Sequence, residues 1–87
     1  MLDFNTIADS IEHARKLHHD FSIGVVIQTP KNLICLKDFT LLTMFKDTST
    51  LIGVIALKRI PDGRNRIIYY AATIEHMKML RQFLTEV

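Results

Sequence analysis

Hydrophobic residues recur at helical spacing near both ends of the chain and at strand spacing between them. Residues 5–19 carry an apolar stripe opposite a charged face, which predicts an amphipathic helix. The stripe consists of Phe4, Ile7, Ile11, Ala14 and His18. Residues 73–86 predict a second helix, for which Thr73 is a suitable N-cap. Its main stripe consists of Ile74, Met77, Leu80, Leu84 and Val87, and Met79 and Phe83 widen that stripe.

Residues 21–36 alternate in the manner of two β-strands joined by a turn. Within the turn segment 29–32, Pro30 suits the second position of a β-turn, because its ring fixes φ near the required value. Closing this turn pairs Ile27 with Ile34 and Val25 with Leu36. One face of this first hairpin is therefore aliphatic, and we expect it to form part of the core.

A second hairpin is predicted from the runs 51–60 and 66–72, which are rich in β-branched residues and flank Asp62-Gly63. A two-residue turn at Asp62-Gly63 requires positive φ at Gly63 and pairs Arg59 with Arg66, Leu57 with Ile68 and Ile55 with Tyr70. Alternation then places Arg59, Arg64, Arg66 and Tyr70 on one face, and Tyr69, Lys58 and Ile67 on the other. Clustered guanidinium groups favour an anion site, whereas the alternative is a solvated loop tip.

The segment from Phe39 to Thr50 fits two patterns. Its apolar residues alternate as in a strand, but Leu41, Leu42 and Phe45 also suit one helical turn. Periodicity does not separate the two in so short a run. We favour a strand that leads into a turn at residues 46–49, with a short helix as the alternative.

These elements predict one α+β domain spanning residues 1–87, since a chain of this length supports a single core. The fold we expect is a four-stranded, mainly antiparallel sheet of two hairpins, with the N- and C-terminal helices packed on one face. Apolar residues make up 48% of the chain, more than such a core hides, so we expect a homodimer. The broad stripe of the last helix supplies the predicted interface, formed by Met77, Met79, Leu80, Phe83 and Leu84.

Charge and cysteine content restrict the function further. The net charge is only +2, but four of the eleven basic residues lie between Lys58 and Arg66. Cys35 is the single cysteine, which excludes an internal disulfide and fits a reducing cytoplasm. The sequence has no signal-peptide pattern and no apolar run of the roughly 20 residues that a membrane span needs. We therefore expect a cytoplasmic protein without a membrane partner.

Motifs for catalysis and for cofactor or metal binding are not evident. His13, His18 and His19 are five, six and one residues apart, which does not match the i, i+4 spacing of a helical metal site. His76 lies within the apolar arc of the last helix. Cys35 sits among aliphatic residues, where burial should raise the pKa of its thiol and leave it inert. The three glycines are isolated, so no phosphate-binding loop is present, and we expect no catalytic residue, cofactor or metal.

The sequence therefore favours a non-catalytic binding module that engages RNA, another polyanion or an acidic protein surface. The predicted site consists of Lys58, Arg59, Arg64, Arg66 and Tyr70. In format alone, the chain is similar to many phage-encoded or mobile-element inhibitors of host toxins and defence nucleases, although no motif carries this likeness. The alternative is a protein-interaction inhibitor that acts through the apolar surface of the last helix. A small acid–base or metal-dependent enzyme is the third hypothesis.

Overall fold

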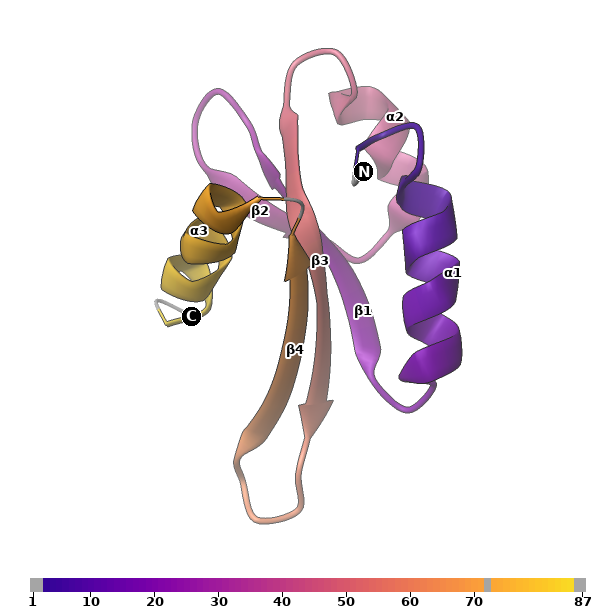
Figure 1. Ribbon diagram of the computed structural model, residues 1–87, viewed down its shortest axis with the longest axis vertical. Helices are drawn as coiled ribbons and strands as arrows, with labels where there is room; N and C mark the ends of the chain where they lie inside the picture. Colours follow the sequence, from indigo (N-terminus) through magenta and orange to yellow (C-terminus); the bar gives the residue numbers. More distant parts are fainter. Residues whose placement is uncertain (1–2, 72, 86–87) are drawn as a thin grey trace.

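The computed structural model describes residues 3–71 and 73–85 and confirms the α+β class (Figure 1). Its elements are α1 (Ile7–Leu17), β1 (Ser22–Gln28), β2 (Leu33–Leu36), the 3₁₀ helix η1 (Phe39–Leu41), α2 (Leu42–Phe45), β3 (Thr50–Arg59), β4 (Asn65–Ala71) and α3 (Ile74–Thr85). The four strands form one antiparallel sheet, and a helix at each end of the chain packs against it. The predicted strand end at residue 72, the helix end at Glu86 and the stripe residue Val87 lie outside the described residues.

The strand order is β2-β1-β3-β4, so the two hairpins meet along β1 and β3 in the middle of the sheet. The predicted register of the first hairpin is confirmed, with Val25 opposite Leu36 and Ile27 opposite Ile34. Between β1 and β3 the register shifts by one residue next to Val26 and Ile27. Such a bulge changes which side chains share a face along the strand.

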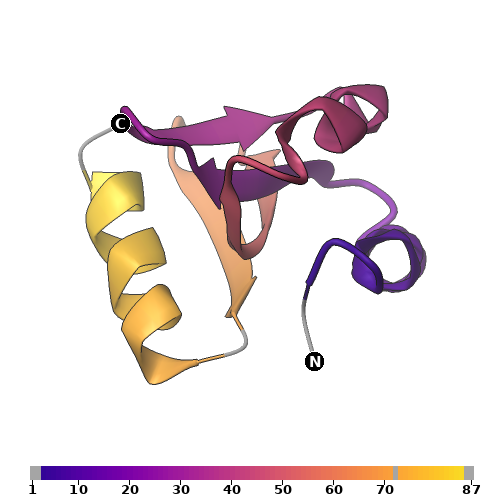
Figure 2. The ribbon, with the colours of Figure 1, turned by 90° about the horizontal axis from the view of Figure 1, so that it is seen from above.

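The two terminal helices cover opposite faces of the sheet, which corrects the prediction that both pack on one face (Figure 2). One cluster joins α1 and α2 to Val25, Ile27, Leu36, Leu51 and Val54. The other joins α3 to Val26, Ile52 and Ile55. The central strands are apolar at consecutive positions, and all residues from Leu51 to Ala56 are buried. A strand that is apolar on both sides must be covered on both faces of the sheet. The unbroken apolar run in the sequence therefore indicates helices on opposite faces.

Helix α3 reaches its face of the sheet because a glycine lies beneath it. Its first turn is capped as predicted, since His76 N donates a hydrogen bond of 3.0 Å to Thr73 Oγ1. Leu80 is 0% exposed, and a Cβ at Gly53 would lie 2.6 Å from Leu80 Cδ1. Leu80 is therefore a core residue with no exposed surface, which corrects its place in the predicted interface. Met79, Phe83 and Leu84 also pack, partly buried, against the α3-side cluster.

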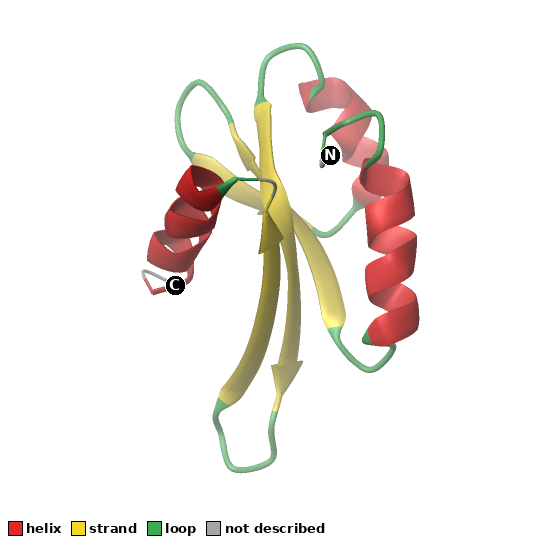
Figure 3. Ribbon diagram, viewed as in Figure 1, coloured by secondary structure: helices red, strands yellow, loops and turns green. Residues whose placement is uncertain are grey.

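The segment after β2 forms a helix rather than the predicted strand (Figure 3). Asp38 ends the extended backbone, because its side chain accepts a hydrogen bond of 3.1 Å from Thr40 N at the start of η1. Leu42 is buried, and Phe39 and Phe45, three residues to either side, pack against the α1-side cluster. The apolar residues therefore follow helical spacing, as the alternative interpretation required.

Candidate nucleic-acid interface

The β3–β4 hairpin is paired one residue away from the predicted register, with Lys58 opposite Arg66. The cause is a loop of three residues instead of two. Ile60 N donates to Arg64 O at 2.9 Å, and Gly63 N donates to Ile60 O at 3.0 Å. Pro61 then takes the second position of the turn, and Gly63 has φ of +94°, which confirms the prediction of positive φ there. This combination is common in three-residue hairpin loops.

The change of register separates the arginines that were predicted to share one face. Arg66, Lys58 and Tyr70 belong to the α1 side of the sheet, because Tyr70 is opposite Val54 of the α1-side cluster. Arg59 pairs with Asn65 and belongs to the α3 side. Tyr69 also lies on the α3 side and packs there, so the prediction that it accompanies Lys58 is wrong. A slip of one residue exchanges faces because side chains alternate.

Two of the four predicted cations have acidic partners within the chain. Lys58 Nζ lies 2.5 Å from Asp20 Oδ2, and Arg64 Nη2 lies 2.6 Å from Asp62 Oδ2. The hydrogen bond from Lys58 lowers the pKa of Asp20, and the hydrogen bond from Arg64 lowers the pKa of Asp62. Both pairs are exposed to solvent, so each acid holds its cation only weakly.

The other two cations, Arg59 and Arg66, are exposed. Within residues 3–71 and 73–85, neither forms an ion pair. Both lie next to the loop that extends farthest from the helices (Figure 1). Because they belong to opposite faces, a ligand on one face contacts only one of them directly.

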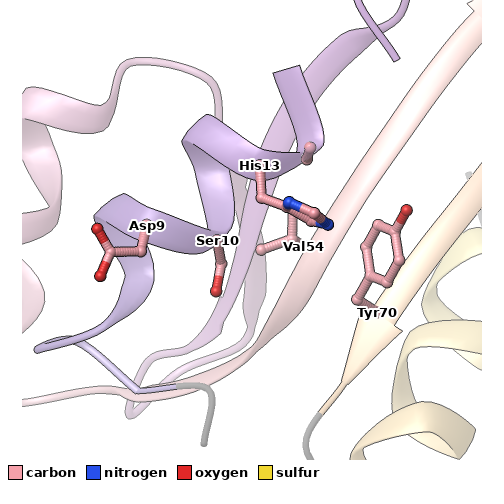
Figure 4. Close-up of a pocket in the computed structure, with 6 residues that line it drawn as sticks. Asp9, Ser10, His13, Val54 and Tyr70 are labelled. Carbon is pink, nitrogen blue, oxygen red and sulfur yellow. The ribbon is translucent and has the colours of Figure 1, made fainter. Parts of the chain in front are cut away.

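A pocket of about 420 Å³ opens between α1 and β4 on the same face as Arg66 (Figure 4). It is lined by Asp9, Ser10, His13, Ala14, Val54 and Tyr70. The ring of His13 extends from α1 toward Tyr70, whereas the carboxylate of Asp9 is directed away from the tyrosine ring. The pocket thus has an apolar floor and a polar rim, a combination typical of small-molecule sites.

Tyr70 is held at the mouth of this pocket by a histidine. His18 Nε2 lies 2.7 Å from Tyr70 Oη, a hydrogen bond between two side chains that are 52 residues apart in the chain. The His18 ring in turn contacts Phe21, with 5.3 Å between ring centroids. Tyr70 is 37% exposed, so its ring is fixed at one end and still open to a ligand. His18, predicted on the apolar stripe, is therefore a positioning residue for this ring.

The arrangement presents, along one face of β4, an aromatic ring beside a pocket and an arginine four residues away. Four residues of strand span about 13 Å. An aromatic ring can stack on a planar group, and a guanidinium can bind a phosphate or carboxylate. The sequence pointed to Arg66 and Tyr70 but not to the pocket, because the pocket depends on where α1 crosses the sheet.

Among the residues that the structure describes, no three His, Cys, Asp or Glu side chains are grouped to hold a metal ion. Cys35 is partly buried, and burial raises the pKa of its thiol, as predicted. In the described parts of the chain, no helix is both long and apolar enough to cross a membrane.

Comparisons with protein-family models, with curated proteins and with solved structures found no match to this chain. The geometry of the hairpin and the pocket is therefore the basis for assigning a function.

Proposed function

We propose that the protein is a non-catalytic module that binds single-stranded RNA on the α1-side face of the β3–β4 hairpin. The observation that carries this proposal is the placement of Tyr70, its adjoining pocket and Arg66 on one exposed face. In the bound state, one base stacks on the Tyr70 ring, and the pocket accepts its edge. Arg66 and Lys58 contact phosphates of the same strand.

A single strand fits this face better than a duplex does. Bases in a duplex are stacked on each other, whereas an unpaired base can turn its face toward an aromatic side chain. The polar groups at the rim, Ser10 and His13, provide hydrogen-bonding atoms for the edge of the base. Stacking tolerates any base, so we expect weak sequence preference. The contacts of Arg66 and Lys58 with phosphates should make the affinity fall strongly as the salt concentration rises.

Binding of a labelled single-stranded RNA, followed by fluorescence anisotropy at several salt concentrations, tests the proposal. Tyr70→Ala removes the stacking surface and should weaken binding by about 5- to 150-fold, in line with a loss of roughly 1–3 kcal/mol. Tyr70→Phe is the matched control, because it keeps the ring and removes only the hydroxyl that His18 contacts. We expect the Phe variant to bind within about threefold of wild type.

Three outcomes would count against the proposal. One is that the protein binds neither RNA nor DNA at low salt. Another is that Tyr70→Ala binds as tightly as Tyr70→Phe, since binding would then not use the ring. The third is tighter binding to a duplex than to a single strand, because the pocket could not be occupied by a paired base.

A further inference from the structure

The outer edge of β4 presents unpaired backbone groups. Hydrogen-bonded and non-hydrogen-bonded pairs alternate along an antiparallel ladder, and Ile60 opposite Arg64 is a hydrogen-bonded pair at the loop. Counting from this pair, the even-numbered residues of β4 direct their N–H and C=O groups toward β3. The odd-numbered residues, including Ile67 and Tyr69, direct theirs outward, away from the sheet.

Beyond Arg66, near its start, this edge lacks the features that usually protect an exposed strand from pairing. Residues 67–71 form an uncharged run of Ile, Ile, Tyr, Tyr and Ala, without proline or lysine. Ile67 is 37% exposed, and Ile74, just beyond the strand, is 78% exposed. The opposite edge, β2, has only four residues and is flanked by Lys31 and Lys37. Of the two edges, β4 is the better template for another strand.

We propose that β4 pairs antiparallel with β4 of a second copy of this chain, with Ile68 on the two-fold axis. In this register the outward-directed residues form the hydrogen-bonded pairs, because Ile67 lies opposite Tyr69 of the second copy. On the α1 side, Ile68 meets Ile68, and Arg66 meets the Tyr70 ring of the second copy. Each opposed pair is apolar–aromatic, apolar–apolar or cation–π, and all of these stabilise a sheet.

The charge distribution favours a second copy as the occupant. Antiparallel pairing sends the two cationic loops to opposite ends of the joined sheet, so they do not repel each other. Each loop approaches the far end of the other β4, where Asp9 lines the pocket beside Tyr70 and Glu75 occupies the first turn of α3. Both acids are exposed, and neither forms an ion pair within the described chain.

Pairing at this edge involves Arg66 and Tyr70, the same two side chains that the proposed RNA site uses, so a bound base and the Arg66–Tyr70 contact compete for the Tyr70 ring. The joined sheet would have eight strands and would carry two pockets, one on each side of the axis. Formation of the dimer does not require RNA, so sedimentation without RNA tests it separately from the proposed function.

A cysteine scan in a Cys35→Ala background tests the register directly. Residues opposite each other in a non-hydrogen-bonded pair have Cα atoms about 4.5 Å apart, within the range of a disulfide. Ile68→Cys should therefore form a disulfide-linked dimer under mild oxidation, seen on a non-reducing gel. Ile67→Cys is the matched control, because its neighbour across the axis is Tyr69 and not itself. Met79→Cys reports on the interface predicted for α3.

Sedimentation velocity of the unmodified chain provides a second readout that needs no cysteine. We expect a dimer at tens of micromolar, and Ile67→Lys should make it monomeric with an unchanged circular dichroism spectrum. Leu41→Lys is the control, since Leu41 has nearly the same exposure, 38%, away from the edge. A monomeric wild-type chain, or cross-linking through Met79→Cys but not Ile68→Cys, would overturn the proposal.

Discussion

The two hairpins of this protein share one topology but differ in what surrounds them. The β1–β2 hairpin has side chains in the core on both faces of the sheet, and its turn is closed by the Thr29 hydroxyl, which accepts from Lys31 N and Asn32 N. The β3–β4 hairpin is anchored in the core at Gly53–Ala56 but continues to an exposed cationic loop (Figure 1). One half of this hairpin is structural, and the other half is accessible to a ligand.

The difference shows how register is controlled in each hairpin. In the first, a one-residue slip would move Val25 and Ile27 from the α1-side cluster to the α3-side cluster and disrupt the packing of both, so burial fixes the pairing. Near the loop of the second, side chains are exposed on both faces and burial adds little. There the three-residue turn at Pro61–Gly63 decides which arginine faces the pocket.

The largest effect we expect comes from adding a methyl group where β3 meets both β4 and α3. In Gly53→Ala, the new Cβ would overlap the carbonyl oxygen of Tyr70 and lie 2.6 Å from Leu80 Cδ1. Backbone cannot move aside cheaply, so urea unfolding should show a loss of about 3 kcal/mol. Gly24→Ala, in the first hairpin, is the control and should lose about 1 kcal/mol, because its only close neighbour is the Cys35 side chain at 2.6 Å. Equal losses would contradict this account.

A smaller loss is expected at the exposed loop. Gly63 has φ of +94° with no atom within 4 Å of an added Cβ, so the cost of Gly63→Val is conformational and not steric crowding. We expect a loss of about 1–2 kcal/mol in the free energy of unfolding, measured by urea denaturation. An unchanged midpoint would mean that the loop does not have this conformation.

Asp20 competes with a phosphate for Lys58, so its removal should strengthen RNA binding. In Asp20→Asn, Lys58 loses its ionic partner at 2.5 Å and becomes free to contact the ligand. The gain should be modest, about two- to fivefold, because the ion pair that is removed is exposed to solvent and weak. Asp47→Asn gives the same change of net charge away from the hairpin and should alter affinity less. A weaker affinity in Asp20→Asn would show that Lys58 is not part of the site.

The smallest effect concerns acid stability. The hydrogen bond from Lys58 lowers the pKa of Asp20 in the folded state, so the pair stabilises the fold above the ordinary carboxyl pKa. This contribution is lost as the pH falls through the lowered pKa. The difference in thermal midpoint between wild type and Asp20→Asn should therefore be present at pH 7 and shrink from about pH 5 downward. A difference that grows at low pH would contradict this assignment.

Much of the fold was predictable from the sequence, because the apolar positions of the local patterns are the positions that are buried in the structure. The two terminal helices, the register of the first hairpin and the cap at Thr73 were all predictable from periodicity, turn and capping residues. The placement of α3 was missed because a helical stripe does not say which face of a sheet it meets. At residues 39–50 the strand was favoured over the helix, because only the tertiary position of Leu42 separates the two.

The candidate RNA site was predicted only in part, because loop length and long-range contacts also decide where its residues lie. Arg66 and Tyr70 were assigned to one face in both registers, since they are four residues apart on one strand. Arg59 was assigned wrongly, because its face depends on loop length, and Asp-Gly is compatible with loops of two or three residues. The pocket and the contact between His18 and Tyr70 join residues that are distant in the chain, and no local pattern encodes them.

The most direct test of the central claim compares two arginines on one hairpin. Arg59→Ala and Arg66→Ala remove the same charge close to the same loop, but from opposite faces of the sheet. If RNA binds on the α1-side face, anisotropy titrations should show a loss of about tenfold for Arg66→Ala and less than about twofold for Arg59→Ala. The slope of affinity against salt should also decrease by about 0.7 only in Arg66→Ala. Equal losses in the two variants, or a larger loss in Arg59→Ala, would contradict the claim.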